Sequence, residues 1–164
     1  AARQLRARYP QAQFRLLGPM DSNPAAVPPG DLEAWRAEGV IEYLPETSDV
    51  RPHLAASTAY VLPSYREGMP RTVLEAMSTG RAIITTDAPG CRDTVIDRKS
   101  GFLCAVKAPA QVADAMAQLL DRPELIAAMG REGRRLAISR FDRAQVIEAT
   151  LAVYERQLQR HRQP

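Results

Sequence analysis

The sequence has few of the residues that build disulfide frameworks and metal sites. It holds two cysteines and two histidines among 164 residues. Cys91 and Cys104 do not form a Cys-x-x-Cys pair, and neither His53 nor His161 has a nearby ligand partner. Two thiols are too few for a disulfide scaffold, and a zinc site needs more ligands than these. We therefore expect reduced, buried thiols, no bound metal and no cofactor.

Long apolar runs are also absent from the sequence. No stretch approaches the ~20 apolar residues that a membrane span needs. Residues 1–6 contain no apolar segment of the kind found in secretory signals, and there is no initiator methionine. We expect a cytoplasmic chain, with the inner face of the membrane as the alternative location, and a fragment whose true start lies upstream.

The chain has little excess of either charge. Its 22 basic and 19 acidic residues give a net charge of +3, and the bases are scattered among the acids. This dilutes any single-signed patch, so the sequence does not favour a nucleic-acid surface. A modest affinity for anionic lipid, as in peripheral membrane association, or for a phosphorylated ligand stays open.

Short apolar segments alternate with helical patterns along most of the chain. Such alternation predicts an α/β fold, a Rossmann-like parallel sheet with helices on both faces. Segments 58–63 and 82–86 are apolar throughout, as expected for strands covered on both sides. The predicted strands are 14–18, 40–43, 58–63, 82–86 and 101–103, and the helices between them are 1–9, 31–39 with Asp31 as its cap, 50–56, and 71–79 opened by Pro70 and closed by Gly80.

Three amphipathic helices follow the last predicted strand. They cover 111–120, 123–137 and a segment capped by Asp142, in which apolar residues recur at intervals of four, three and four: Ile147, Leu151, Tyr154 and Leu158. We expect a single domain over 1–164, with an α/β core at 1–141 and a C-terminal helix and tail at 142–164. The polar segment 157–164 is expected to fray. A loop with four prolines (Pro19, Pro24, Pro28 and Pro29) is predicted at 18–30.

The junction from residue 62 to residue 77 carries the chemistry. Open parallel sheets bind ligands where strands end and helices begin. The helix after this junction is predicted to have no polar face and to be buried, with Glu75 in its middle. A carboxylate in such a place needs hydrogen-bond donors. An arginine from elsewhere in the fold could supply them, or the two hydroxyls of a ligand diol such as a ribose.

Gly68 and Met69 precede the helix, so their amides are placed at its N-terminus. That end carries free donors and partial positive charge, which suits a diphosphate or sugar hydroxyls. An ordinary tight turn would also use a glycine there. Glu67, in the same loop, could hold a sugar hydroxyl or could be a solvated acid.

Taken together, Glu67 and Glu75 are separated by seven residues and flank a Gly-Met-Pro turn. This arrangement resembles the Glu-x7-Glu signature of the group 1 (family 4) glycosyltransferases of the two-Rossmann-domain, or GT-B, type. Segments 60–64 and 82–95 resemble the family's strands into the site and the turn that follows. Segment 100–103 resembles its later Asn-Gly-Phe-Leu element. The resemblance covers residues ~14 to 142.

The resemblance implies the donor-binding, C-terminal half of a GT-B enzyme that transfers a hexosyl group with retention and without metal. Consistent with this, the sequence has no Asp-x-Asp motif. Glu67 would be the catalytic residue at the donor sugar, and Glu75 would hold the ribose. Gly68 and Met69, with Pro70 and Arg71, would complete the site for a UDP- or GDP-sugar. An N-terminal domain, absent here, would bind a saccharide or lipid-linked acceptor, so the isolated fragment is expected to be inactive.

Two departures from the family's pattern matter. The family's C-terminal domain begins with a strand and a turn that bears an arginine and a lysine, and this chain starts after them, so a first, central strand is expected to be missing. Segment 88–90 is Ala-Pro-Gly where many relatives have Gly-Gly. Segment 90–95 is similar to bacterial surface-polysaccharide enzymes that handle galactose-type sugars. The alternatives are a GT-B nucleotide-sugar epimerase and a non-catalytic nucleotide-binding module.

Overall fold

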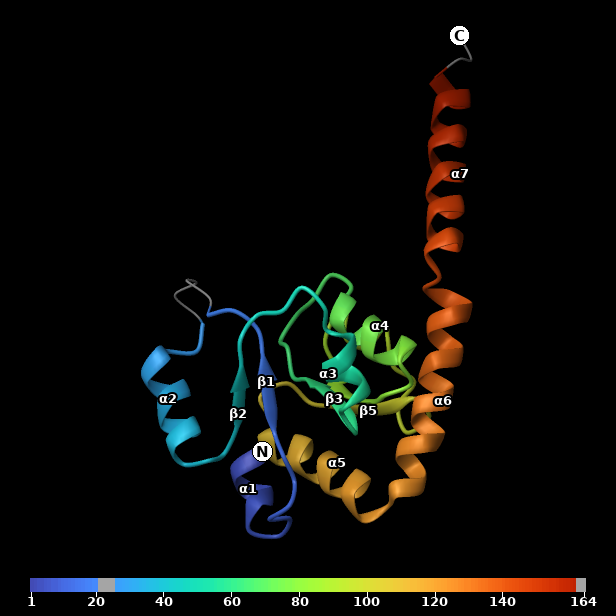
Figure 1. Ribbon diagram of the computed structural model, residues 1–164. Helices are drawn as coiled ribbons and strands as arrows, with labels where there is room; N and C mark the ends of the chain where they lie inside the picture. Colours follow the sequence, from blue (N-terminus) through green and yellow to red (C-terminus); the bar gives the residue numbers. More distant parts are fainter. Residues whose placement is uncertain (21–25, 162–164) are drawn as a thin grey trace.

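The structure is a computed structural model that describes residues 1–20 and 26–161. Helices and strands alternate along the chain in the order that the sequence predicts (Figure 1). The elements are α1 (Ala2–Arg6), β1 (Arg15–Leu17), α2 (Pro29–Ala37), β2 (Glu42–Leu44), α3 (Arg51–Ala55), β3 (Ala59–Leu62), α4 (Arg71–Ser78), β4 (Ala82–Thr86), β5 (Gly101–Cys104), α5 (Pro109–Asp121), α6 (Pro123–Arg140) and α7 (Arg143–His161).

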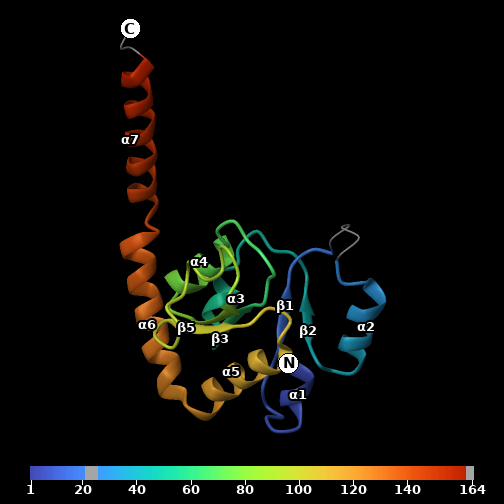
Figure 2. The same ribbon diagram turned by 180° about the vertical axis from the view of Figure 1, so that it is seen from behind.

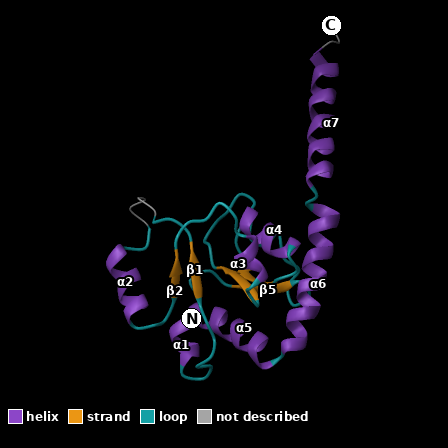
Figure 3. Ribbon diagram, viewed as in Figure 1, coloured by secondary structure: helices purple, strands orange, loops and turns teal. Residues whose placement is uncertain are grey.

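The strands are parallel, as predicted, but they form two sheets instead of one (Figure 3). One sheet pairs β1 with β2, and the other has the order β3-β4-β5 with β4 in the centre. In the described residues, β1 and β3 each have one edge without a strand partner. β1 lies on the side nearer the three-stranded sheet in both views (Figures 1 and 2). The expected loss of a first, central strand stays a prediction.

The three-stranded sheet holds the core, because helices cover both of its faces. Ile83 of β4 packs on one face with Met77 of α4 and Leu136 of α6. Ile84 points to the other face and packs with Val112 of α5 and Met129 of α6. All five residues of β4 are buried. The prediction of a parallel sheet with helices on both faces is therefore confirmed.

Three sequence predictions about helices are wrong in detail. α2 begins at Pro29 with Pro28 as its cap, so Asp31 lies inside the first turn, where a carboxylate suits the helix dipole. Segment 157–161 continues α7 to His161, and residues 162–164 lie outside the described part of the chain. α4 does have a polar face, which is described with the site. Pro24, in the predicted proline loop, also lies outside the described residues.

α7 extends away from the rest of the molecule (Figures 1 and 2). Asp142 caps it as predicted, because its Oδ1 accepts a hydrogen bond from the Ala144 amide at 2.9 Å. The predicted apolar stripe is present but uncovered: Ile147, Leu151, Tyr154 and Leu158 are 50–61% exposed. Over the described residues, no helix has the length and apolar character that crossing a membrane requires.

Both cysteines are buried and unpaired, as predicted. Cys91 is fully buried in the turn after β4, and Cys104 ends β5 with 3% of its surface exposed. Burial raises the pKa of the Cys104 thiol, and the charges of Asp97 and Asp114 raise it further. The thiol of Cys104 is therefore held in its protonated form.

Candidate functional site

The predicted site residues come together where β3 ends. The chain leaves β3 at Leu62, forms a loop over residues 63–69 and enters α4 at Arg71. Glu67 is half-buried in this loop, whereas Gly68 and Met69 are exposed. Glu75 is half-buried in α4. Because β3 is parallel to β4, the loop stands at the carboxyl edge of the sheet, the place where such sheets bind ligands.

The N-terminus of α4 presents free amides beside the loop. Pro70 is buried and caps the helix, and its carbonyl accepts hydrogen bonds from the amides of Val73 at 3.0 Å and Leu74 at 3.2 Å. Within the described residues, the amides of Gly68 and Met69 have no acceptor. An anion or a sugar hydroxyl can therefore be bound at this end of the helix.

The expectation that α4 has no polar face is wrong. Arg71, Thr72 and Ser78 are exposed, while Val73 and Met77 are fully buried, so the helix is amphipathic. The apolar residues occupy the middle of the helix, and its polar residues lie mainly at the two ends. Arg71 is the first residue of α4, and it has no acidic partner among the described residues.

Glu75 lies at the border between the buried and the exposed faces of α4. It follows Arg71 by four positions and precedes Ser78 by three, so the three share one side of the helix. In the part of the chain that the structure describes, no arginine pairs with Glu75. The structural explanation for this carboxylate, an arginine from elsewhere in the fold, therefore finds no support.

Tyr60 of β3 shares a side-chain hydrogen bond with Thr72 of α4, a contact that the sequence did not predict. Burial raises the pKa of its hydroxyl, a hydrogen bond with Thr72 lowers it, and the charges of Glu75 and Glu67 raise it. Tyr60 therefore connects β3 to the first turn of α4, the two elements that the 63–69 loop joins. Nothing in the spacing of Tyr60 and Thr72 along the sequence predicts this contact.

The turn after β4, residues 87–93, contacts the 63–69 loop. The Glu67 amide donates a hydrogen bond to the carbonyl of Pro89 at 3.0 Å. Arg92 pairs with Asp87 at 2.8 Å and also donates to the Asp87 carbonyl at 2.8 Å, which closes the turn. Segment 88–90, the departure from the pattern of relatives, thus contacts the loop that carries Glu67.

Lys107 borders the site on the side of β5. Its ammonium lies 5.7 Å from the centre of the Tyr65 ring, a cation–π contact between the loop after β5 and the 63–69 loop. Lys107 has a φ of 57°, one of the few non-glycine residues here in the left-handed region. The sequence did not predict this contact, because nothing in the spacing of Tyr65 and Lys107 indicates it.

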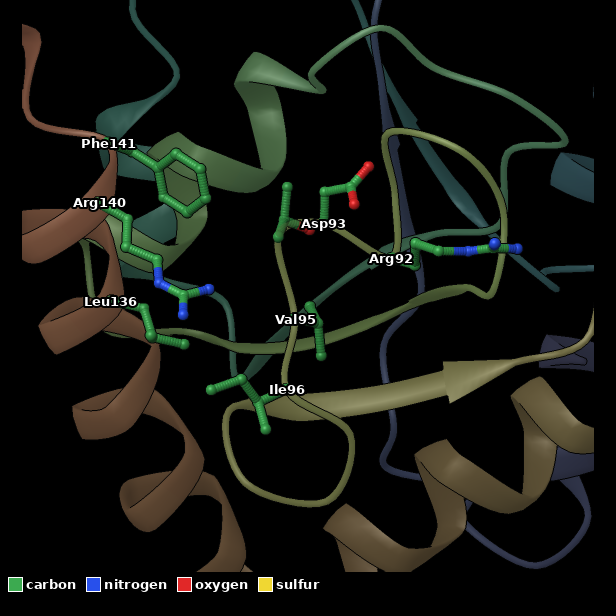
Figure 4. Close-up of a pocket in the computed structure, with 8 residues that line it drawn as sticks. Arg92, Asp93, Val95, Ile96, Leu136, Arg140 and Phe141 are labelled. Atoms are coloured by element: carbon green, nitrogen blue, oxygen red, sulfur yellow. The ribbon is translucent and has the colours of Figure 1, made fainter. Parts of the chain in front are cut away.

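One cavity of about 220 Å³ lies near this site but does not include the predicted residues. Leu136, Arg140 and Phe141 line one side of it, and residues 92–96 line the other (Figure 4). Arg140 points toward Val95 and Ile96, whereas Arg92 points away from α6 (Figure 4). Across the described ranges, no group of three or more metal-ligating side chains comes together.

Comparison with protein families gives one match. The model of a family described as "Glycosyl transferases group 1" matches residues 1–122 of this chain. The match includes the whole of the 63–69 loop and α4.

Known proteins resemble the chain in sequence and in fold. An α-1,3-N-acetylgalactosaminyltransferase of Campylobacter jejuni, named for its N,N'-diacetylbacillosaminyl-diphospho-undecaprenol acceptor, is 30% identical over 89% of this chain. The chain spans 38% of that relative's length and 28% of that of a putative glycosyltransferase, EpsD, of Bacillus subtilis.

Among solved structures, Anabaena HepE in complex with UDP-glucose superposes with a TM-score of 0.74 at 22% identity, over 88% of this chain and 42% of HepE. The sucrose-phosphate synthase of Thermosynechococcus elongatus superposes with a TM-score of 0.80 at 24% identity, over 94% of this chain and 40% of that enzyme. These structural similarities show that the chain has the α/β, Rossmann-like fold of these proteins.

Proposed function

The chain belongs to the group 1 glycosyl transferases, and from that membership we propose that it is the nucleotide-sugar-binding half of a GT-B transferase. The intact enzyme moves a hexosyl group from the nucleotide to a saccharide or lipid-linked acceptor, with retention of configuration. Its setting is bacterial polysaccharide or glycoconjugate synthesis in the cytoplasm. An N-terminal domain supplies the acceptor site.

The proposal is carried by the amides of Gly68 and Met69, which have no acceptor within the described residues, and by the half-buried carboxylates that flank them, Glu67 in the loop and Glu75 in α4. Glu75, which has no arginine partner in the described residues, accepts hydrogen bonds from the ribose hydroxyls. The amides of Gly68 and Met69 bind the diphosphate or the sugar, because unpaired N–H groups at a helix start attract anions. Arg71, exposed at the first helical position, adds positive charge.

Glu67 has a different task from Glu75. It stands in the loop before the helix, nearer the carboxyl edge of the sheet, and it contacts the sugar that is transferred. A contact at the reacting group acts on turnover, whereas a contact at the ribose acts on binding. This division of roles follows the resemblance in sequence.

UDP is the nucleotide that we propose. HepE binds UDP-glucose, and the Campylobacter relative transfers N-acetylgalactosamine according to its name. Segment 90–95, which is similar to enzymes for galactose-type sugars, supports a sugar of the galactose configuration. UDP-N-acetylgalactosamine and UDP-galactose are therefore the first donors to test.

A ligand screen of the full-length protein tests the proposal. The melting temperature is measured with UDP-, GDP- and ADP-sugars at equal concentrations. A donor at 100 times its Kd stabilises a protein by about 2.7 kcal/mol, so a true donor raises the melting temperature measurably. A shift with UDP-sugars and none with the others supports the proposal, and no shift with any nucleotide sugar contradicts it.

Metal independence gives a second test. No metal-ligating group of three or more comes together in the described residues, and we propose that transfer proceeds without a cation. Activity measured in EDTA should equal activity in its absence. Loss in EDTA and recovery with Mn²⁺ or Mg²⁺ would refute this part of the proposal. The 164-residue chain, which spans 38% of the length of the Campylobacter relative, should alone bind UDP weakly and transfer nothing, because the proposed N-terminal domain is needed to orient the reactants.

A further inference from the structure

The end of β4 holds the start of the 63–69 loop. The hydroxyl of Thr86, which is 1% exposed, donates a hydrogen bond to the carbonyl of Ser64. The hydroxyl of Thr85, equally buried, donates to the carbonyl of Leu62 at 2.8 Å. The three residues before them in β4 are apolar, and a valine would fill the volume of either threonine. The hydroxyls are therefore explained by these two bonds and not by packing.

Gly90 holds the middle of the same loop. A Cβ atom at Gly90 would lie 2.3 Å from the carbonyl oxygen of Glu67 and 2.5 Å from that of Gly68. The residue has a φ of +80°, and its amide donates to Oδ2 of Asp93 at 3.0 Å. Only a glycine lets the loop come this close while the Glu67 amide bonds to Pro89.

These contacts fix the loop on both sides of one short segment. Between the Ser64 bond and the Gly90 contact, Tyr65 and Arg66 have exposed side chains, and Glu67 alone is half-buried. The direction of the Glu67 side chain is set by a backbone that Thr86 and Gly90 hold. A shift of the backbone by about 1 Å would move the carboxylate away from a reacting group.

We propose that Thr86 and Gly90 are positioning residues that orient Glu67 for transfer. They touch no substrate and act through the backbone of residues 64–68. This inference rests on the proposed function, in which Glu67 meets the transferred sugar. It goes beyond that function because it assigns the orientation of Glu67 to residues of a different strand and turn.

Replacement of Thr86 in the full-length protein tests the first half. Thr86→Val keeps the shape and removes the bond to Ser64, so kcat should fall about 10- to 100-fold while the donor KM changes less than about 3-fold. Thr86→Ser retains the hydroxyl and should restore kcat to within about 3-fold of the original. The assignment would be overturned if Thr86→Val raised the donor KM without lowering kcat, or if Thr86→Ser did not restore kcat.

Ser100→Ala is the matched control for Thr86. Ser100 is fully buried, and its hydroxyl accepts a hydrogen bond from the Ile96 amide at 2.9 Å. It precedes β5, at the opposite edge of the sheet from the 63–69 loop. Ser100→Ala should lower stability and leave kcat per folded molecule unchanged. Equal losses of kcat in Thr86→Val and Ser100→Ala would show a general packing effect and overturn the proposal.

Gly90→Ala tests the second half, and amide exchange separates the inference from the proposed function. Hydrogen exchange at the Glu67 amide, measured on the full-length protein, needs no donor. Exchange should accelerate about 10-fold or more in Gly90→Ala and Thr86→Val but not in Ser100→Ala. Unchanged exchange in both loop variants overturns the inference. If exchange accelerates in these variants but the full-length protein transfers no sugar, the proposed function is refuted, while the role of Thr86 and Gly90 in holding the loop backbone is retained.

Discussion

β4 buries all five of its residues, whereas β1 exposes its first two, although both are short parallel strands. The difference comes from their surroundings. β4 is paired on both sides and covered by α4 and α6 on one face and by α5 and α6 on the other, whereas β1 pairs with β2 alone in the described residues. The candidate site stands on the better-packed sheet. A site on rigid support keeps its geometry, so the comparison ties function to the region with the most burial.

The largest difference between the two sheets is expected in stability. Met77 of α4 is fully buried and packs with Ile83 of β4, whereas Leu16 of β1 is 43% exposed. The two side chains are of similar size. Met77→Ala should lower the free energy of unfolding by about 2–5 kcal/mol, because it leaves a cavity in a packed core. Leu16→Ala should cost less than about 1 kcal/mol. Urea denaturation of the two variants measures this, and equal losses would remove the distinction between the sheets.

A second difference is expected in turnover. Glu67→Ala in the full-length protein should lower kcat roughly 100-fold with a smaller change in donor KM, because the lost contact is at the reacting sugar. Glu42→Ala is the control on the other sheet, since Glu42 is an acid that pairs with Arg15 at 2.8 Å. It should leave both constants unchanged. Steady-state kinetics with the donor found in the screen decides between these outcomes.

Donor affinity should respond to Glu75 in a different way. Glu75→Ala should raise the donor KM by about 10-fold or more and lower kcat less, since a charge-assisted hydrogen bond contributes about 1.5–3 kcal/mol. Titration calorimetry of the full-length variant with UDP measures the binding directly. Purely affinity-type losses of equal size in the Glu67 and Glu75 variants would contradict the division of roles between them.

The smallest expected effect lies in the connection between the sheets. Asp49, before α3, has a pKa lowered to about 2 from 3.8, chiefly by a hydrogen bond from the Arg51 side chain and also by one from the Arg51 amide. Because the folded value lies below the unfolded one, this contribution is complete above about pH 4 and is lost as the pH falls toward 2. The melting temperatures of the original chain and of Asp49→Asn should therefore converge over that range. A difference that stays constant with pH would refute the assignment.

Much of the fold follows from local pattern. The continuous apolar run of 82–86 predicted a strand covered on both faces, and β4 is such a strand. Helix ends at Asp142 and near Gly80 were also predicted from capping residues, because caps act within one turn. The extent of the buried face of α4 was predicted wrongly, because periodicity does not indicate how much of a helix its neighbours cover.

The features that the sequence did not predict depend on distant parts of the chain. The division into two sheets, the hydrogen bond between Tyr60 and Thr72, and the contact of Gly90 with the 63–69 loop each depend on residues that folding brings together. The roles of Glu67 and Glu75 came from resemblance, and the structure adds that Glu67 lies in the 63–69 loop and Glu75 in α4. The apolar stripe on α7 was predicted, but its spacing does not indicate whether another element covers it, and in the structure its residues are exposed.

The two buried thiols allow local opening of the three-stranded sheet to be followed by chemical modification. A thiol reagent reacts with an exposed thiolate, so Cys91 and Cys104 must wait for the structure around them to open. Cys104 ends β5, and Cys91 sits in the turn that contacts the 63–69 loop. The rate at which each thiol becomes modified then reports how often that part of the molecule opens, strand and turn separately. No label or substitution has to be introduced to follow the opening of the region that carries the site.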